Sequence, residues 1–202
     1  NLISEGVPED EIMLLTFTNK AAKNMIERIE KKINKQTYIL GGTFHHVANI
    51  FLRKYSSYLG YKPNYTIIDE ADAVKLLKMI IKEDYSDNKE IPKAETLHKI
   101  YSYSRNSLSS FRDYVESNCK GYLDEMKTID EIYEKYKKRK NNMMDFDDLL
   151  YNFNLLLENN PEIITIIKNK YKFIFVDEFQ DTNKLQFEII KKIYSEKNYL
   201  FV

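Results

Sequence analysis

The sequence predicts an α/β protein in which a parallel sheet is interrupted by a helical insertion. Apolar runs followed by helix-like segments occur near both ends of the chain, as in a doubly wound sheet with right-handed crossovers. The middle of the chain has helical spacing and almost no strand-like run. Only 5 Gly and 4 Pro occur in 202 residues, so we expect few turns and long helices.

The composition is that of a folded globular protein. Hydrophobic residues make up 43% of the chain and charged residues 31%, which excludes a disordered or collagen-like chain. The formal net charge is zero, so any basic site has to be local. The single cysteine, Cys119, forms no disulfide within the chain, and no apolar run reaches the roughly 20 residues that cross a bilayer. We therefore expect a cytoplasmic protein with no membrane partner.

The first part of the chain contains two strand-and-helix units. Residues 12–17 (IMLLTF) and 38–44 (YILGGTF) are apolar runs typical of strands. The helix expected after the first strand has an apolar stripe of Ala22, Met25, Ile26, Ile29 and Ile33. The helix expected after the second has an apolar stripe of Val47, Ile50, Phe51 and Leu59.

The middle of the chain is predicted to be helical. Only residues 65–68 resemble a strand, and the expected helices cover residues 71–83, 94–103, 108–118 and 122–140. The composition changes sharply at the turn-forming residues 62–64 and at the polar residues 140–142. We predict a domain formed by residues 1–63 and 141–202, with residues 64–140 as a helical subdomain inserted into it.

The last part of the chain returns to strand and helix. Residues 171–176 (YKFIFV) are almost continuously apolar, as in a strand that is buried on both faces of a parallel sheet. A helix with an apolar stripe of Leu185, Ile189, Ile190 and Ile193 follows. Residues 199–202 (YLFV) predict a fourth strand. Because the chain begins without Met and stops in this strand, we expect a fragment with an incomplete sheet.

Two adjacent acids, Asp177 and Glu178, follow the strand at 171–176. In open α/β sheets ligands bind at the carboxyl ends of the strands. At that position Asp177 is suited to hold Mg²⁺ through its water shell, and Glu178 to deprotonate a water that attacks a γ-phosphate. The alternative is that both acids cap the next helix and complement its dipole. The dipeptide alone leaves both interpretations open.

Longer motifs around these residues resemble one family. VDEFQDTN resembles motif II of superfamily 1 DNA helicases of the UvrD/Rep/PcrA type, LLTFTNKAA resembles their motif Ia, GGTFH their motif Ib, and MDFDDLL a further family motif. The resemblance runs through essentially the whole chain. It implies a RecA-like sheet of the P-loop NTPase type, in a motor domain called 1A that carries an insertion called 1B. It also implies ATP and Mg²⁺ as cofactors.

The resemblance implies roles for particular residues. In the catalytic site, Glu178 is the base, Asp177 holds Mg²⁺ together with Glu178, and Gln180 and Asp181 link hydrolysis to DNA. The implied DNA contacts are Phe17 by stacking, with Thr18, Asn19, Lys20, Thr43, Phe44 and His45 beside it. His46 stands where the family usually has Ser, which leaves that contact open.

Several of these positions also have a structural interpretation. Phe17 is equally suited to a hydrophobic core, Thr18 to an N-cap and Lys20 to a solvated surface. The acids of MDFDDLL are accounted for by Asp145 as an N-cap with Asp147 and Asp148 in the first helical turn. The alternative that they lie beside the nucleotide and DNA path and transmit closure between domains stays open. The basic run that ends the insertion is interpreted as a solvated helix face, although contact with a DNA backbone stays open; it comprises Lys135, Lys137, Lys138, Arg139 and Lys140. No Cys or His spacing fits zinc.

The sequence as a whole therefore predicts part of an ATP-dependent DNA helicase that translocates on single-stranded DNA, 3′ to 5′ by resemblance. Expected partners are single-stranded DNA and junctions with duplex, and the expected processes are repair or replication. No GxxxxGK[ST] loop occurs in these residues, so the fragment alone is expected to be inactive. The alternatives are a helicase-nuclease and a non-catalytic DNA-binding or partner-docking module of the same fold. The sequence specifies no protein partner.

Overall fold

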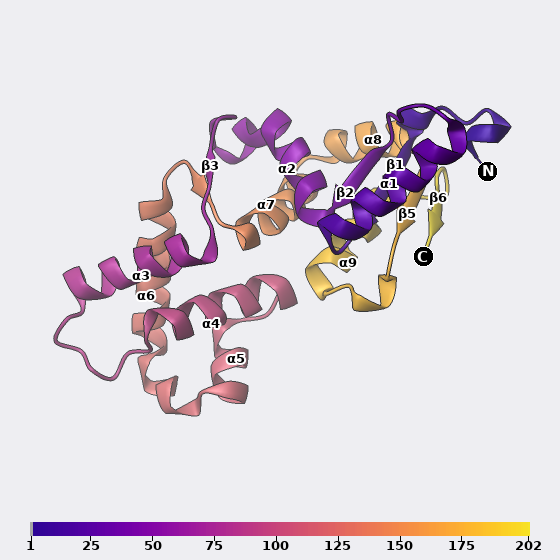
Figure 1. Ribbon diagram of the computed structural model, residues 1–202. Helices are drawn as coiled ribbons and strands as arrows, with labels where there is room; N and C mark the ends of the chain where they lie inside the picture. Colours follow the sequence, from indigo (N-terminus) through magenta and orange to yellow (C-terminus); the bar gives the residue numbers. More distant parts are fainter. Residues whose placement is uncertain (1) are drawn as a thin grey trace.

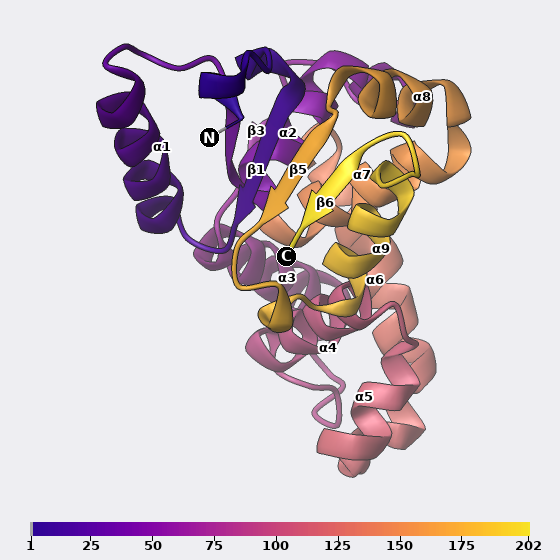
Figure 2. The same ribbon diagram turned by 90° about the vertical axis from the view of Figure 1, so that its right-hand side faces the viewer.

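The structure is a computed structural model and describes residues 2–202. Nine helices and six strands occur in these residues, and Figures 1 and 2 show them in two views. The first part of the chain contains β1 (Ile12–Thr16), α1 (Asn19–Ile33), β2 (Leu40–Thr43) and α2 (Phe44–Tyr55). The middle contains β3 (Thr66–Ile67), α3 (Glu70–Asp84), α4 (Ala94–Ser107), α5 (Phe111–Asn118) and α6 (Met126–Lys140). The last part contains β4 (Met143–Met144), α7 (Phe146–Asn159), α8 (Pro161–Lys170), β5 (Phe173–Val176), α9 (Lys184–Ile193) and β6 (Tyr199–Phe201).

The main sheet has four parallel strands in the order β2-β1-β5-β6. Met13 of β1 lies opposite Leu40 on one side and Ile174 on the other. After β1 the chain adds β2 on one side of the sheet, whereas after β5 it adds β6 on the opposite side. The predicted α/β class with a parallel sheet is therefore confirmed, and the order changes direction between β1 and β5.

Helices cover the two faces of this sheet unequally. Met13, Leu15, Ile174 and Val176 belong to the main hydrophobic core, together with buried residues of α7 and α9. Figure 2 shows α1 on the opposite side of the sheet, where a cavity of about 240 Å³ separates it from β1 and β5. On that side Phe173 and Phe175 are only half-buried. The prediction that β5 is buried on both faces is therefore wrong, and β1 is the strand that is buried throughout.

The stripe expected on α2 is partly wrong. Val47 and Phe51 are buried as predicted, but Ile50 is 39% exposed. Ala48 and Leu52 complete the buried face instead, and both have no exposed surface. The sequence VANIFL contains two overlapping helical stripes, and the packing against α7 selects the one that includes the smaller Ala48.

Helices α3 to α6 form a second hydrophobic core, centred on fully buried residues such as Leu77, Leu97 and Ile129. In Figure 1 these helices gather away from the main sheet. The chain reaches them through β3 and leaves them through β4, and the two short strands pair in parallel, with Thr66 opposite Met143. The sequence predicted a strand at β3 but missed β4, which has only two residues. None of the helices described between residues 2 and 202 combines the length and apolarity that crossing a bilayer demands.

Helix ends follow local capping chemistry. Leu108 ends α4 with a left-handed backbone (φ 53°), and Ser110 caps α5 with a reciprocal bond to Asp113. The helix expected from residue 108 therefore begins at Phe111. The helix expected from residue 122 begins as a 3₁₀ turn (Lys120–Glu125) and becomes α-helical at Met126.

Candidate functional site

The segments that carry the implied site residues all leave the same edge of the main sheet. Phe17 follows β1, Thr43 ends β2, and Asp177 follows β5. Because the three strands are parallel neighbours, their carboxyl ends meet at one edge. The strand order changes direction between β1 and β5, and ligands of open α/β sheets bind at such a point. The sheet therefore places the acid pair one strand away from the segment that begins with Phe17.

The acid pair is held by the backbone. The N–H of Asp177 donates to the carbonyl oxygen of Leu15 at 2.9 Å, which extends the pairing of β5 with β1. Glu178 adopts a left-handed backbone with φ 50° and ψ 43°, a conformation that is costly for a residue with a side chain. Its carboxylate accepts a hydrogen bond from Nε2 of Gln180. The side chain of Glu178 is exposed at the carboxyl edge.

The acids do not cap the helix that follows. Asn183 is the N-cap of α9: its Oδ1 accepts from the N–H of Gln186 at 2.8 Å, and its own N–H donates to Oε1 of Gln186 at 3.0 Å. Residues Phe179–Asp181 form a separate 3₁₀ turn, and Glu178 makes no side-chain capping bond to it. The interpretation that Asp177 and Glu178 cap α9 is therefore wrong, whereas a favourable interaction of the two acids with the helix dipole stays a prediction.

The donor chemistry of the pair fits Mg²⁺. The carboxylates of Asp177 and Glu178 are hard oxygen ligands, and a Mg²⁺ ion in a phosphate site usually takes one or two carboxylates and completes its shell with water and phosphate oxygen. Within residues 2–202, no group of three or more His, Cys, Asp or Glu side chains is arranged as a metal site. A dedicated protein cage is absent from the described residues, whereas a site shared with a nucleotide matches the two carboxylates.

The segment after β1 combines a helix start with a partly buried ring. Thr18 caps α1 by accepting a hydrogen bond from the N–H of Ala21 at 3.1 Å, as the structural interpretation predicted. Asn19 and Lys20 are exposed in the first turn. The ring of Phe17 is half-buried and packs on Phe44 at 5.6 Å between centroids. The first turn of α1 therefore presents free amide groups and a positive charge at the carboxyl edge of the sheet.

The segment after β2 is built around two glycines. A Cβ on Gly42 would lie 2.5 Å from the ring of His46, and one on Gly41 would lie 2.7 Å from Ile26 of α1. Thr43 caps α2 by accepting from the N–H of His46 at 3.1 Å. The ring of Phe44 is only 3% exposed and lies in the main hydrophobic core, and the DNA contact implied for this residue stays a prediction. Phe44 supports the ring of Phe17 from within the core.

His45 is half-buried beside the start of α7. Burial lowers the pKa of its imidazole, and the charge of Asp147 partly opposes that shift. The ring of His45 meets the ring of Phe146 edge to face at 5.9 Å. Phe146 is 52% exposed although it lies next to the candidate site. The motifs did not single out Phe146, because its position after an N-cap is shared with the buried Phe44 and does not predict whether a ring is exposed.

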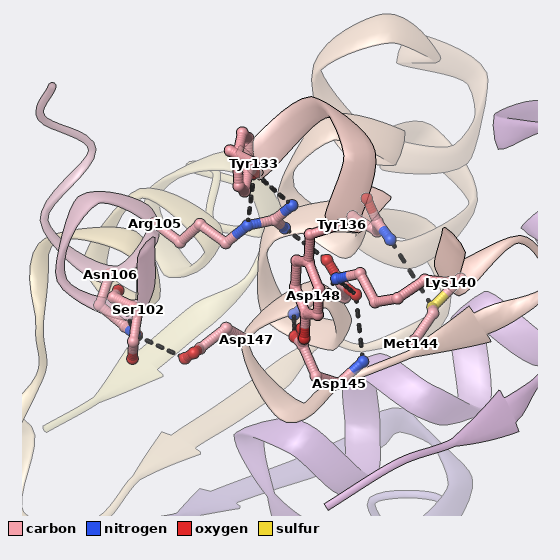
Figure 3. A network of polar contacts seen from close by, with 11 residues as sticks. Ser102, Arg105, Asn106, Tyr133, Tyr136, Lys140, Met144, Asp145, Asp147 and Asp148 are labelled. Carbon is pink, nitrogen blue, oxygen red and sulfur yellow. Dashed lines mark hydrogen bonds and ion pairs between the residues drawn. The ribbon is translucent and has the colours of Figure 1, made fainter. Parts of the chain in front are cut away.

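The other acids of MDFDDLL belong to a buried ion cluster between the two cores. Asp145 caps α7 in a reciprocal box with Asp148, which confirms the capping interpretation. Both carboxylates contact Nζ of Lys140, at 2.8 Å in the case of Asp145, and Nη1 of Arg105 lies 2.8 Å from Asp148. Figure 3 shows these side chains converging from α4, α6 and α7. Although burial opposes its ionisation, the charge and hydrogen bond of Lys140 lower the pKa of Asp145.

The basic run at the end of α6 is therefore not a uniform solvated face. Lys140 is only 2% exposed, so the solvated interpretation is wrong for this residue. Three other basic residues of the run form ion pairs with acids on α6 or α3. Lys135 pairs with Asp84 at 2.9 Å, Lys137 with Glu134 at 2.7 Å and Arg139 with Glu83 at 2.6 Å. These pairs reduce the positive charge that this face offers to a phosphate backbone.

Taken together, a parallel α/β sheet with an acid pair and two helix starts at its carboxyl edge defines an α/β domain of the open-sheet class, in which the carboxyl edge is the usual place of a ligand site. The chain belongs to the UvrD/REP helicase family, because the family model of the UvrD/REP helicase N-terminal domain matches residues 1–202. This match confirms the resemblance found in the motifs.

Individual relatives agree with the family model. The chain is 32% identical over 198 residues to an ATP-dependent DNA helicase PcrA of Staphylococcus aureus, which covers 96% of this chain and 27% of that protein. It is 34% identical over 185 residues to an ATP-dependent DNA helicase PcrA of Bacillus subtilis, covering 90% of this chain and 24% of the relative. The chain thus spans about a quarter of the length of these relatives.

Proposed function

We propose that the chain is part of an ATP-dependent DNA helicase that moves along single-stranded DNA. The observation that carries the proposal is the position of Asp177 and Glu178 at the carboxyl end of β5, next to the end of β1 where the segment from Phe17 to Lys20 starts. A nucleotide site and a DNA site on neighbouring strands of one rigid sheet allow a change at one site to reach the other. The family membership and the names of the relatives support the same activity.

On the nucleotide side, we assign separate tasks to the two acids. Mg²⁺ bound with ATP would neutralise charge on the phosphates. Asp177, fixed through its backbone to Leu15, holds the water shell of that ion together with Glu178. Glu178 accepts a proton from the attacking water, and Gln180, which donates to its carboxylate, orients that group. Gln180 and the exposed Asp181 are the residues through which hydrolysis would be linked to DNA.

On the DNA side, the two helix starts contact phosphate and the aromatic rings contact bases. The first turns of α1 and α2 offer amide groups, and Thr18, Asn19, Lys20, Thr43 and His45 surround them. Phe17 is the stacking residue implied by the motif, and its support by Phe44 leaves one part of the ring exposed. Phe146 presents a larger exposed ring beside His45 and is a second stacking residue.

The organisation of the proposed helicase follows from the two cores. We assign residues 1–63 and 141–202 to the motor domain and residues 64–140 to the inserted subdomain, in agreement with the separate hydrophobic cores. Tyr65 is an exception, because its side chain is buried in the core of the motor domain, and the partly buried Ile67 and Leu108 pack against the same core. We further propose 3′ to 5′ movement, action at junctions of single-stranded and duplex DNA, and a role in repair or replication in the cytoplasm.

The experiment that tests this function uses the full-length parent protein. ATP hydrolysis is measured with and without single-stranded DNA, and strand separation is measured on duplexes with a 3′ or a 5′ tail. Stimulated hydrolysis with unwinding of the 3′-tailed duplex is the expected result. Binding of DNA without hydrolysis would instead identify a non-catalytic binding module, and unwinding of only the 5′-tailed duplex would reverse the proposed direction.

A further inference from the structure

We propose that Asn106, a residue of the inserted helices, is a positioning residue for the loop that carries Asp177 and Glu178. Asn106 lies in the last turn of α4, and its carboxamide bridges two segments of the other core. Nδ2 of Asn183 donates to Oδ1 of Asn106 at 2.9 Å, and Nδ2 of Asn106 donates to Oδ1 of Asp147 at 2.7 Å. Figure 3 shows the second of these bonds. The inference rests on the proposed function, because the loop acts in that activity.

At the first end of this bridge, Asn183 closes the acid-bearing loop. It follows the loop directly and caps α9, so its Oδ1 is already used by the N–H of Gln186 at 2.8 Å. Its Nδ2 donates to Asn106, and this bond connects Asn183 to the insertion. The position of the loop end is therefore set jointly by α9, on which Asn183 sits, and by α4, which packs against α9.

At the other end, Asp147 lies in the first turn of α7, next to Phe146 and within the electrostatic reach of His45. The carboxamide of Asn106 thus stands between the residues assigned to DNA and the loop assigned to the nucleotide. Residues 106, 147 and 183 come from three helices that pack on one another, α4, α7 and α9. A shift of α4 relative to the sheet would move both contacts together.

The chemistry of the bridge requires a carboxamide at position 106. Asp147 has only acceptor oxygens when ionised, so the group facing it has to be a donor, while Asn183 presents a donor and needs an acceptor. One amide supplies both, and its second proton is donated to the carbonyl oxygen of Ser102 at 2.9 Å. A carboxylate at position 106 would face Asp147 with like charge, and a hydrocarbon would leave both partners without a bond.

The test compares Asn106→Ala with Asn88→Ala in the full-length parent. Nδ2 of Asn88 donates to Glu125 at 3.1 Å, so the control removes a side-chain hydrogen bond of an asparagine between two residues of the insertion. At saturating single-stranded DNA, Asn106→Ala is expected to lower kcat for ATP hydrolysis about fivefold, with KM for ATP unchanged. Of the bonds that this change removes, the one to Asn183 reaches the acid-bearing loop, and loss of one ordinary hydrogen bond gives this factor. Asn88→Ala is expected to leave both constants within about twofold.

A second variant distinguishes loss of the bond from a folding defect of Asn106→Ala. Asn183→Asp keeps the acceptor that caps α9 and loses only the donor to Asn106, so it is expected to lower kcat by the same factor. The kcat of the double variant is expected to be no lower than that of Asn106→Ala alone, because both changes remove the same bond between Asn106 and Asn183. A kcat for Asn106→Ala equal to that of Asn88→Ala, or losses that multiply in the double variant, would overturn the proposal.

Amide hydrogen exchange separates this proposal from the proposed function. Faster exchange in residues 177–183 is expected in Asn106→Ala than in Asn88→Ala, and this readout needs no enzymatic activity. If the wild-type parent shows no DNA-stimulated hydrolysis, the proposed function fails, and the exchange result alone supports or overturns the positioning by Asn106. Equal exchange in the two variants overturns it.

Discussion

The backbone N–H of Asp177 donates to the carbonyl oxygen of Leu15 at 2.9 Å, so the first acid of the pair is an extension of the sheet. Glu178 comes one residue later, where the backbone turns into the left-handed region. The sheet thereby fixes the backbone of Asp177, whereas Glu178 lies in the turn and has an exposed side chain that accepts a hydrogen bond from Gln180. The separate roles proposed for the two acids follow from this difference.

Glu178→Gln is expected to abolish ATP hydrolysis in the full-length parent while ATP and DNA still bind. The amide keeps the size of the side chain but accepts no proton, and loss of a general base lowers kcat by about 10²- to 10⁴-fold. Steady-state hydrolysis and nucleotide binding are measured on the same preparation. Glu188→Gln, a change on α9, is the control, and wild-type turnover in Glu178→Gln would refute the assignment of the base.

Phe17→Leu is expected to reduce DNA-stimulated hydrolysis more than basal hydrolysis. Leucine retains apolar contact with Phe44, so the core is largely preserved while the stacking ring is lost. Hydrolysis is measured over a range of single-stranded DNA concentrations and in its absence. An equal loss in both conditions would show that the ring is a core residue only.

Phe146→Ala is expected to weaken binding of single-stranded DNA with little effect on folding, because the ring is 52% exposed. Stacking of one base on an aromatic side chain contributes about 1–3 kcal/mol, so Kd should rise by about 5- to 150-fold. Fluorescence anisotropy with a labelled oligonucleotide measures this change. Tyr58→Ala, which removes a ring that is 56% exposed at the far end of the helical segment after β2, is expected to leave Kd unchanged.

Lys140→Met is expected to destabilise the chain by about 3–5 kcal/mol, because it leaves two buried carboxylates, Asp145 and Asp148, without their shared cation. Urea denaturation followed by circular dichroism measures the change in the free energy of unfolding. Lys138→Met alters an exposed lysine of the same helix and is expected to cost less than about 0.5 kcal/mol. Equal effects of the two changes would mean that the cluster contributes no more than a surface charge.

The affinity for single-stranded DNA is expected to rise as the pH falls below 6.5, the ordinary pKa of histidine. Burial lowers the pKa of His45, so the free protein holds this imidazole neutral near pH 7, whereas a bound phosphate favours its charged form. The same lowered pKa favours folding above pH 6.5, and that contribution is lost as the pH falls. DNA affinity and stability should therefore change in opposite directions.

Anisotropy titrations at pH 7.5 and pH 5.5 test this expectation. The matched pair of variants is His45→Gln and His46→Gln, since the two histidines are adjacent in the sequence and only the first is packed beside Asp147 and Phe146. The pH dependence should disappear in His45→Gln and persist in His46→Gln. Wild-type pH dependence in His45→Gln would remove this residue from the DNA site.

Local patterns predicted the elements well and the contacts between them poorly. The apolar runs that became β1 and β5, and the caps Thr18 and Asp145, are encoded by neighbouring residues, so a single sequence reveals them. Lys140 is different, because it ends a basic run that is otherwise exposed. Its partners are defined only after the insertion has folded back on α7, as are the contacts of Arg105 with Asp148.

In the candidate site, too, the sequence predicted the local features but not the contacts between remote parts of the chain. The motifs named Asp177, Glu178 and the two helix starts, and parallel strand order brings them to one edge. They gave no way to distinguish Phe44, which is buried, from Phe146, which is exposed, because both lie next to an N-cap in a motif. The exposure of each ring is decided by what packs on it from remote parts of the chain.

The parallel pairing of β3 with β4 bears on how the inserted helices can be exchanged or removed. Strands that run in opposite directions are joined by a tight turn, so a module placed between them is easily excised or replaced. Parallel strands need a connection that travels back before the second strand begins. If the inserted helices are removed, another crossover connection has to join β3 to β4. The insertion is therefore harder to delete or replace than a segment between antiparallel strands.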